Sequence, residues 1–202
     1  MIKVKEKKKT HGIQLLLRAV VRDPDGKIVS DTGKNPARSF VTQFLEFIGA
    51  LFDGLDTDAT PLPPPYSDEP IYYTAYNFTQ HLTIKGPVGD DDYGPVVGTG
   101  DTAAANTDYL LQAQLTHGAG AGNITHGATT VGTAGVAGAN VDLEVERTFT
   151  NNTGSTIGVK EVGIYAQSVN HDFCIVRDVF PGTVNVPDKF SLTIYYTIRT
   201  TA

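Results

Sequence analysis

Three charged residues stand at positions where the surrounding sequence is apolar: Arg147, Glu161 and Arg177. Each interrupts a strand-like run with an apolar face, so each side chain is expected to be buried. A buried charge persists only when it is paired and hydrogen-bonded. Glu161 is therefore either a catalytic carboxylate or a partner in an ion pair with one or both arginines. The pattern favours the structural pair.

Clustered acidic and imidazole groups indicate two weak candidate metal sites. Asp90, Asp91 and Asp92 could bind calcium, because hard cations prefer oxygen ligands. This run lacks the alternating ligand spacing and the glycine of a calcium-binding loop, so a solvated acidic loop is favoured. His117 and His126 could face each other across a hairpin and bind a transition metal, but no third ligand is in view. No cofactor is assigned.

Other chemical motifs are weaker still. Gly98–Ala103 superficially resembles a dinucleotide loop, but no βαβ pattern follows it, and Asp101 would repel a pyrophosphate. Cys174 is the only cysteine and lies in an apolar run, so it is expected to pack as a small hydrophobic residue. No Ser/His/Asp arrangement has supporting context. The sequence predicts a protein that is not an enzyme.

Composition bounds the class of protein. The 202 residues carry a formal net charge of -6, which argues against sequence-independent nucleic-acid binding. The basic residues of arm 1–11 predict a solvated or partner-bound tail. Charged residues are only 19%, and 21 glycines and 11 prolines fit many short strands joined by turns. Without a signal peptide or a long apolar run, we expect synthesis in a host cytoplasm and no membrane contact.

Alternating apolar residues predict most of the strands. Residues 140–166 predict a central hairpin that turns at Asn151–Ser155, and residues 12–30 predict another that turns at Asp23–Gly26. The apolar phase of the second strand slips near Lys160–Glu161, which indicates either a β-bulge or burial of both faces. Residues 190–198 alternate cleanly and predict a C-terminal strand.

The remaining segments predict a helix, a linker and the main sheet. Residues 35–53 predict a helix, with Asn35 as its cap and Pro36 in its first turn, packed on the sheet or on a neighbouring subunit. Prolines predict an extended linker over 54–70, and the main sheet is expected over 71–202. Asp108–Leu115 predicts a strand or a short helix. Residues 173–180, apolar on both faces, predict an inner or interface strand. The interface candidates are Phe40, Phe44, Phe47, Phe173, Ile175 and Val179.

Several short motifs share a recognisable pattern. The upstream passage is Val97–Thr102, which contains Gly-Thr-Gly, followed by Asp108–Leu110. The C-terminal motifs are Arg147–Asn151, Val159–Tyr165, Val176–Val179 and Phe190–Tyr196. Together with the first hairpin and the stretch Arg38–Phe47, they resemble certain small virion structural proteins of tailed bacteriophages. Such proteins occupy neck, tail, fibre or capsid-decoration positions, so the resemblance implies a virion subunit.

The sequence thus predicts a mainly β protein: a single antiparallel, jelly-roll-like β-sandwich domain over residues 1–202, with one amphipathic N-terminal helix. Apolar faces of the predicted helix and strands would remain exposed in a monomer. They predict assembly into a homo-oligomer, a trimer or ring, together with other virion proteins. The alternative is a host-glycan-binding fibre or decoration module that uses Tyr72, Tyr73 and Tyr76. A third hypothesis, a hydrolase using Glu161 or the aspartates, lacks a supporting acid and base pair.

Overall fold

Antiparallel strands make up nearly all of the regular structure in the described residues. The computed structural model describes residues 12–37, 40–42, 44–45, 83–167 and 172–201. All strand pairs formed by these residues are antiparallel, so the expectation of a mainly β protein is confirmed. The strands are β1 (Gly12–Arg22), β2 (Ile28–Asp31), β3 (Asn35–Pro36), β4 (Gly94–Gly98), β5 (Thr125–Val131), β6 (Gly135–Ala137), β7 (Asn140–Thr150), β8 (Ile157–Gln167), β9 (Asp172–Val186) and β10 (Ser191–Thr201).

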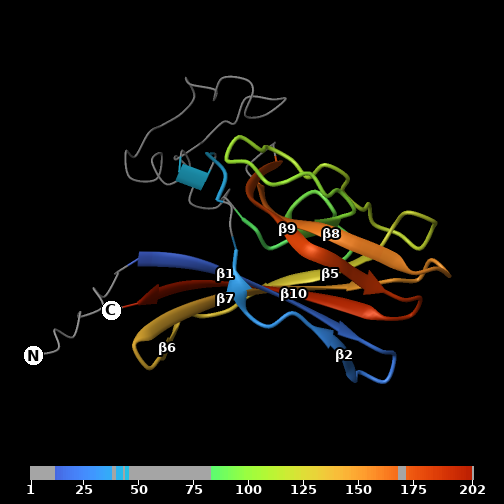
Figure 1. Cartoon of the computed structure of the whole chain (residues 1–202), viewed down its shortest axis with the longest axis horizontal. Coiled ribbons are helices and arrows are strands. Elements are labelled where there is room, and N and C mark those ends of the chain that lie inside the picture. The colour runs from blue at the N-terminus through green and yellow to red at the C-terminus, as the bar shows by residue number, and fades with distance from the viewer. Residues whose placement is uncertain (1–11, 38–39, 43, 46–82, 168–171, 202) are drawn as a thin grey trace, which may run out of the picture.

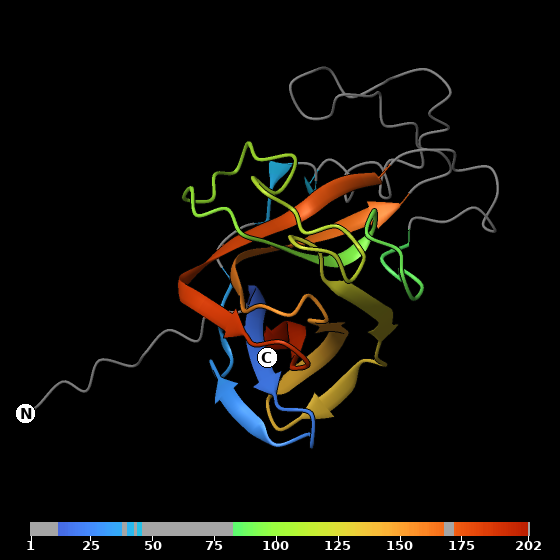
Figure 2. The same cartoon turned by 90° about the vertical axis from the view of Figure 1, so that its right-hand side faces the viewer.

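The strands of the described residues form two sheets that face each other. The larger sheet has seven strands in the order β2-β1-β10-β7-β5, with β3 paired to β1 and β6 paired to β7. The smaller sheet has the order β4-β8-β9 and lies over part of the larger one (Figure 1). The view at right angles shows the same two layers (Figure 2). Within the described residues, no helix has the length and apolar character needed to span a membrane.

The first hairpin folds as expected. Asp23 Oδ1 accepts hydrogen bonds from the backbone N–H groups of Asp25 (3.1 Å) and Lys27 (2.9 Å), and Gly26 has φ 82°. This turn joins β1 to β2. β1 also pairs with β10 along its whole length, so the N-terminal hairpin is part of the main sheet. The boundary of the main sheet at residue 71 is therefore wrong.

The central hairpin over residues 140–166 is wrong in its pairing. Both predicted strands exist, but β7 pairs with β10, β5 and β6, whereas β8 pairs with β4 and β9. The chain crosses between the sheets at Asn151, which is fully buried. Its Nδ2 donates to the carbonyl oxygens of Ser155 and Val186, both at 2.7 Å. Asn151 thereby stabilises a corner, and alternation alone cannot tell a corner from a hairpin.

The predicted bulge and burial both occur in the smaller sheet. The register between β8 and β9 shifts between Val159 and Glu161, which is a β-bulge at Lys160. Beyond it, β8 is buried on both faces. β9 is also buried on both faces over residues 173–178, but in the described residues it is an edge strand, not an inner one. Residues 40–41 bond to its free side at Ile175 and Val176.

The helix predicted over residues 35–53 is wrong at its start. Asn35 and Pro36 form β3 and pair with Leu17 and Leu16 of β1. Most of the rest of that prediction lies outside the described residues, as do arm 1–11, linker 54–70 and Tyr72, Tyr73 and Tyr76. Asp108–Leu115 is neither strand nor helix but a loop with one isolated bridge, between Gly98 and Gln114.

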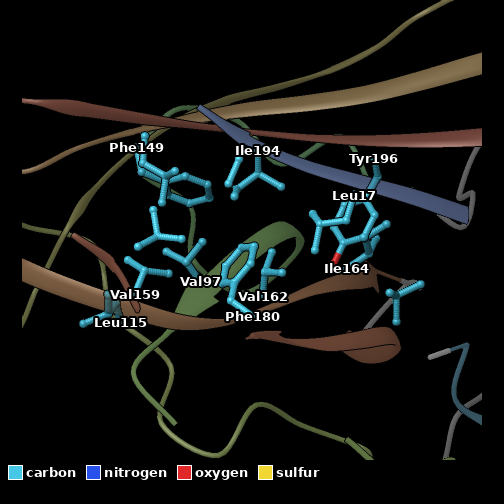
Figure 3. Packing of buried hydrophobic residues seen from close by; sticks show 14 of the residues in the cluster. Leu17, Val97, Leu115, Phe149, Val159, Val162, Ile164, Phe180, Ile194 and Tyr196 are labelled. Carbon is cyan, nitrogen blue, oxygen red and sulfur yellow. The ribbon is translucent and has the colours of Figure 1, made fainter. Parts of the chain in front are cut away.

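The core lies between the two sheets. Leu17, Phe149, Ile194 and Tyr196 of the larger sheet point toward apolar side chains of the smaller sheet and its loops (Figure 3). These side chains alternate along their strands with residues of the opposite face, as the period-two pattern of residues 190–198 predicts. The facing residues labelled in the same view are Val97, Leu115, Val159, Val162, Ile164 and Phe180.

Candidate functional site: a buried carboxylate and a clamped loop

Glu161 on β8 is the centre of a buried hydrogen-bond network. Its residue exposure is 0%. Oε1 accepts from the backbone N–H groups of Gly100 (3.1 Å) and Ala113 (2.7 Å), and Oε2 accepts from the N–H of Gln112 (3.0 Å). The carboxylate therefore fixes both ends of residues 99–113 against the outer face of the smaller sheet. We call this segment the clamped loop.

Two glycines let the backbone approach this carboxylate. A Cβ at Gly98 would lie 2.5 Å from the carbonyl oxygen of Ala113 and 2.6 Å from Glu161 Oε1. A Cβ at Gly100 would lie 2.5 Å from the same Oε1. All three distances are shorter than any van der Waals contact, so the Gly-Thr-Gly motif serves close approach of the backbone. Its role here is to receive a carboxylate.

Arg177 on β9 completes the network from the other side. Its Nε and Nη2 donate to Glu161 Oε2 at 3.0 and 2.9 Å, and Nη1 donates to Asp108 Oδ2 at 2.7 Å. Although burial alone lowers the pKa of Arg177, the hydrogen bonds with Asp108 and Glu161 raise it overall. Nη2 also donates to the carbonyl oxygen of Thr102 (3.0 Å). The structure thus brings together Glu161 and Arg177, as the ion-pair interpretation expects.

The clamped loop covers a small apolar cluster. The backbone N–H of Leu111 donates to the Tyr165 hydroxyl at 2.7 Å, and Leu111 packs with Val96, Tyr165 and Cys174. Burial raises the pKa of the Cys174 thiol well above its usual range, which makes it a poor nucleophile. Tyr109 and Leu110, the neighbours of Leu111, are exposed instead.

Arg147 on β7 takes no part in this network, so of the two arginines that were candidate partners of Glu161 only Arg177 pairs with it. Arg147 is fully buried, and in the described part of the chain it forms no ion pair. Its guanidinium donates five hydrogen bonds to backbone carbonyl oxygens instead. Burial lowers its pKa, while the charges of Asp90 and Asp91 oppose that effect. The acceptors are Gly127 (2.8 Å), Tyr93 (2.9 Å), Pro95 (3.0 Å), Pro87 (3.1 Å) and Asp90.

The acidic run shapes the loop that surrounds Arg147. Asp90 Oδ1 accepts from the backbone N–H groups of Asp92 (3.0 Å) and Tyr93 (3.3 Å), and Asp91 Oδ2 accepts from the N–H of His117 (2.6 Å). Burial and the charges of Asp90 and Asp91 raise the pKa of Asp92. In the described ranges, no three His, Cys, Asp or Glu side chains are placed to hold one metal ion.

His117 and His126 are neighbours, as the hairpin interpretation expects, with ring centroids 5.9 Å apart. They are joined through the backbone: the N–H of His126 donates to His117 Nδ1 at 3.1 Å. His126 Nδ1 lies 3.0 Å from the carbonyl oxygen of Ile124. Both Nδ1 atoms are therefore engaged with the backbone.

The interface candidates divide into core and surface residues. Phe173 and Ile175 are 2% and 8% exposed and belong to the chain's own core, so their prediction as interface residues is wrong. Phe40 and Phe44 stack at 4.0 Å and pack partly buried against that core. Val179 is half-buried, and Phe47 lies outside the described residues.

A row of exposed residues was missed by sequence reasoning. Ile13, Thr200, Val141 and Val136 are successive partners across β1, β10, β7 and β6. Ile13, Val141 and Val136 are 68%, 40% and 81% exposed, although they continue the alternation of the core-facing side. This end of the larger sheet extends beyond β8 and β9 (Figure 1). We call these four residues the exposed row; single-strand patterns cannot reveal where a facing sheet stops.

The chemistry of the Glu161 centre is that of a structural clamp. Its carboxylate receives three backbone N–H bonds and two from Arg177, and no part of it is open to a substrate. Comparison of the chain with protein-family models, with curated proteins and with solved structures finds no match in any of the three.

Proposed function

We propose that this chain is a non-enzymatic structural subunit of a tailed-phage virion, in a neck, tail or capsid-associated position, and that it forms a homo-oligomer. The proposal includes one domain over residues 1–202, with the two sheets arranged as a jelly-roll-like sandwich. The observation that carries it is the clamp. Gly100, Asp108, Glu161 and Arg177 belong to the motifs that resemble virion proteins, and they form one connected hydrogen-bond network. Gly98, from the same motifs, lets the backbone pass close to Glu161.

This network supports a structural role because each of its members serves the fold. A general acid or base must exchange a proton with a substrate, which requires a free and accessible oxygen. The Glu161 oxygens are buried and occupied by five donors. A motif whose residues hold a loop in place is expected in a protein that presents surfaces to partners.

The exposed row supports assembly. Three apolar side chains on the core-facing side of a sheet remain open to solvent among the described residues. Contiguous apolar surface of this kind marks interaction sites in soluble proteins. A homo-oligomer would cover it by pairing equivalent surfaces or by closing a ring.

Two measurements test the proposal. Light scattering of the purified chain at several concentrations is expected to give the mass of a discrete trimer or ring. Mass spectrometry of particles purified from the source strain is expected to find the chain at a fixed ratio to the capsid protein. Absence of the chain from particles that are otherwise complete would contradict the virion assignment, whatever the oligomeric state.

A host-glycan-binding module is the second candidate, and one feature favours it. A groove of about 430 Å³ lies between β2 and the second half of β9. Its lining has no charged side chain and offers the hydroxyls of Ser30, Thr32 and Thr183, the amide of Asn185 and the ring of Pro181. Neutral polyhydroxylated ligands suit such a lining. A glycan array without signal would count against this candidate.

A further inference from the structure

His126 is a buried imidazole with one nitrogen unpaired. A carbonyl oxygen can only accept, so the contact with Ile124 places the proton of the neutral ring on Nδ1. Nε2 then carries a bare lone pair, and it is buried without a hydrogen-bond partner among the described residues. The ring lies edge-on to Phe149, with centroids 5.0 Å apart. A proton added at Nε2 would find no acceptor in this site.

In His117, Nδ1 must be unprotonated, whereas in His126 Nδ1 carries the proton. The Nδ1 of His117 accepts the backbone N–H of His126, so this nitrogen must be unprotonated for the bond to exist. Protonation would place one N–H against another and break the contact. The backbone of His117 is held by Asp91 Oδ2 at 2.6 Å, and the backbone oxygen of His126 accepts from Gly89 at 3.0 Å. The two histidines thus join the 116–126 turn to the neighbouring acidic loop.

We propose that His117 and His126 form an acid-labile lock, which holds the 116–126 turn and the start of β5 against β7 at neutral pH and opens when the imidazoles are protonated. The geometry of both rings requires the neutral state. The proposal concerns a conformational device and stands apart from the virion assignment.

The charges around the lock oppose protonation. Burial, and next the Arg147 guanidinium, lower the pKa of His126 to about 4; the bond to Ile124 and the carboxylate of Asp91 act in the opposite direction, while His117 adds to the lowering. Phe149 on β7 contributes no charge. Acidification therefore gathers cations beside Arg147, with Asp91 as the nearby anion, and their repulsion favours opening.

Opening has a defined structural consequence. Thr125 and His126 pair with Thr150 and Phe149, where β5 covers the edge of β7. Release of this part of β5 exposes backbone N–H and C=O groups of β7, and such an edge can pair with an added strand. The lock thus controls whether this edge of the larger sheet is available to a partner.

Amide hydrogen exchange followed by NMR between about pH 7 and pH 4 tests the lock. Protection of amides in residues 116–131 is expected to fall at least ~10-fold relative to β1 and β10 amides in the same sample. In His117→Asn/His126→Asn, the amide groups replace the Nδ1 contacts without titrating, and the relative protection is expected to stay constant. Unchanged relative protection in the wild-type protein overturns the proposal.

Matched variants separate the lock from other effects of acid. The chain has five histidines, so His11→Asn/His81→Asn/His171→Asn removes the other three and is expected to keep the wild-type response. His117→Asn alone keeps the contact with the His126 N–H without a titrating ring and is expected to reduce the acid-induced loss of protection, which keeps the test usable should the double variant fail to fold. Opening that persists unchanged in the double variant, or that disappears in the triple variant, overturns the proposal.

Discussion

Arg177 donates two hydrogen bonds to a single oxygen of Glu161, from Nε at 3.0 Å and from Nη2 at 2.9 Å, with both side chains almost completely buried. The pair links β8 to β9 and, through Asp108 and the N–H groups on Glu161, both strands to the clamped loop. Among the described residues, removal of Arg177 leaves the Glu161 charge buried without an ion-pair partner, and removal of Glu161 leaves Arg177 buried with only Asp108 as its ion-pair partner. Loss of one partner is the most destabilising way to alter a buried ion pair.

Glu161→Ala is expected to lower the free energy of unfolding by about 3–5 kcal/mol, because Arg177 loses its main partner and three N–H groups lose their acceptor. Urea denaturation measures this change. Asp101→Asn, which removes the exposed ion pair with Lys160, is the control and should leave the midpoint within experimental error. A thermal melt unchanged in Glu161→Ala would falsify the role given to this carboxylate.

Gly100→Ala is expected to destabilise the protein by about 1–3 kcal/mol, because its Cβ would collide with Glu161 Oε1 and with Gln112. The same substitution at Gly182, where no atom lies within 4 Å, should change the free energy of unfolding by less than about 0.5 kcal/mol. Equal effects at the two positions would show that the clamped loop can move away from the carboxylate at little cost.

Arg147→Lys is expected to cost more than about 3 kcal/mol although it keeps the charge. A lysine ammonium has three donors, and it cannot reproduce five hydrogen bonds spread over five carbonyl oxygens, so several acceptors stay unsatisfied. Chemical denaturation gives the cost, and amide shifts of residues 86–95 report whether the loop is released. A loss below about 1 kcal/mol would mean that fewer of these bonds contribute than the geometry indicates.

Stability is expected to fall with acid through His126. The pKa of His126 is lowered from 6.5 to about 4 in the folded protein, so between these values the unfolded chain binds the proton and the folded chain does not. The free energy of unfolding should therefore decrease as pH falls from 6.5 to 4, by at most about 3 kcal/mol, and this contribution should then level off. The difference between wild-type protein and His126→Asn in urea titrations isolates the effect; identical pH profiles would contradict it.

Val136→Asp is expected to reduce the oligomer mass measured by light scattering, because it places a charge in the exposed row. Val88→Asp is a matched control: Val88 is 73% exposed, similar to the 81% of Val136, but lies outside the row. If the native protein is oligomeric and neither change alters its mass, the row is not part of the interface.

Local pattern predicted the individual strands better than their partners. Alternation identified β7 and β10, because one buried face per strand is visible in the sequence, and apolar runs beside turn residues identified β1 and β8. It missed the corner at Asn151, since the turn residues of a hairpin and of a sheet-to-sheet crossing are the same types. Pro36 is typical of the first turn of a helix, and the sequence predicted one there. Its pairing with Leu16 of β1 places it in β3 instead. Tertiary pairing decided both cases.

The contacts of the candidate site could be predicted from the sequence only where one side chain binds another side chain. Glu161 and Arg177 are complementary charges, so their pairing followed from burial alone. The hydrogen-bond donors of Arg147 are paired with backbone carbonyl oxygens. Every residue carries such an oxygen, so the residue types in the sequence do not indicate which ones Arg147 contacts. The exposed row depends on where the facing sheet ends, which is a property of the assembled layers.

The position of β10 sets the order in which the larger sheet can form. β1 and β7 pair with opposite edges of β10 along eleven residues each, and β1 does not pair with β7. During synthesis on the ribosome, β1 emerges long before β10. The backbone groups of β1 that pair with β10 therefore stay unpaired until β10 is made. Co-translational folding of this sheet is therefore delayed until residues 191–201 leave the exit tunnel, and any arrest upstream of them leaves two aggregation-prone strand edges unpaired.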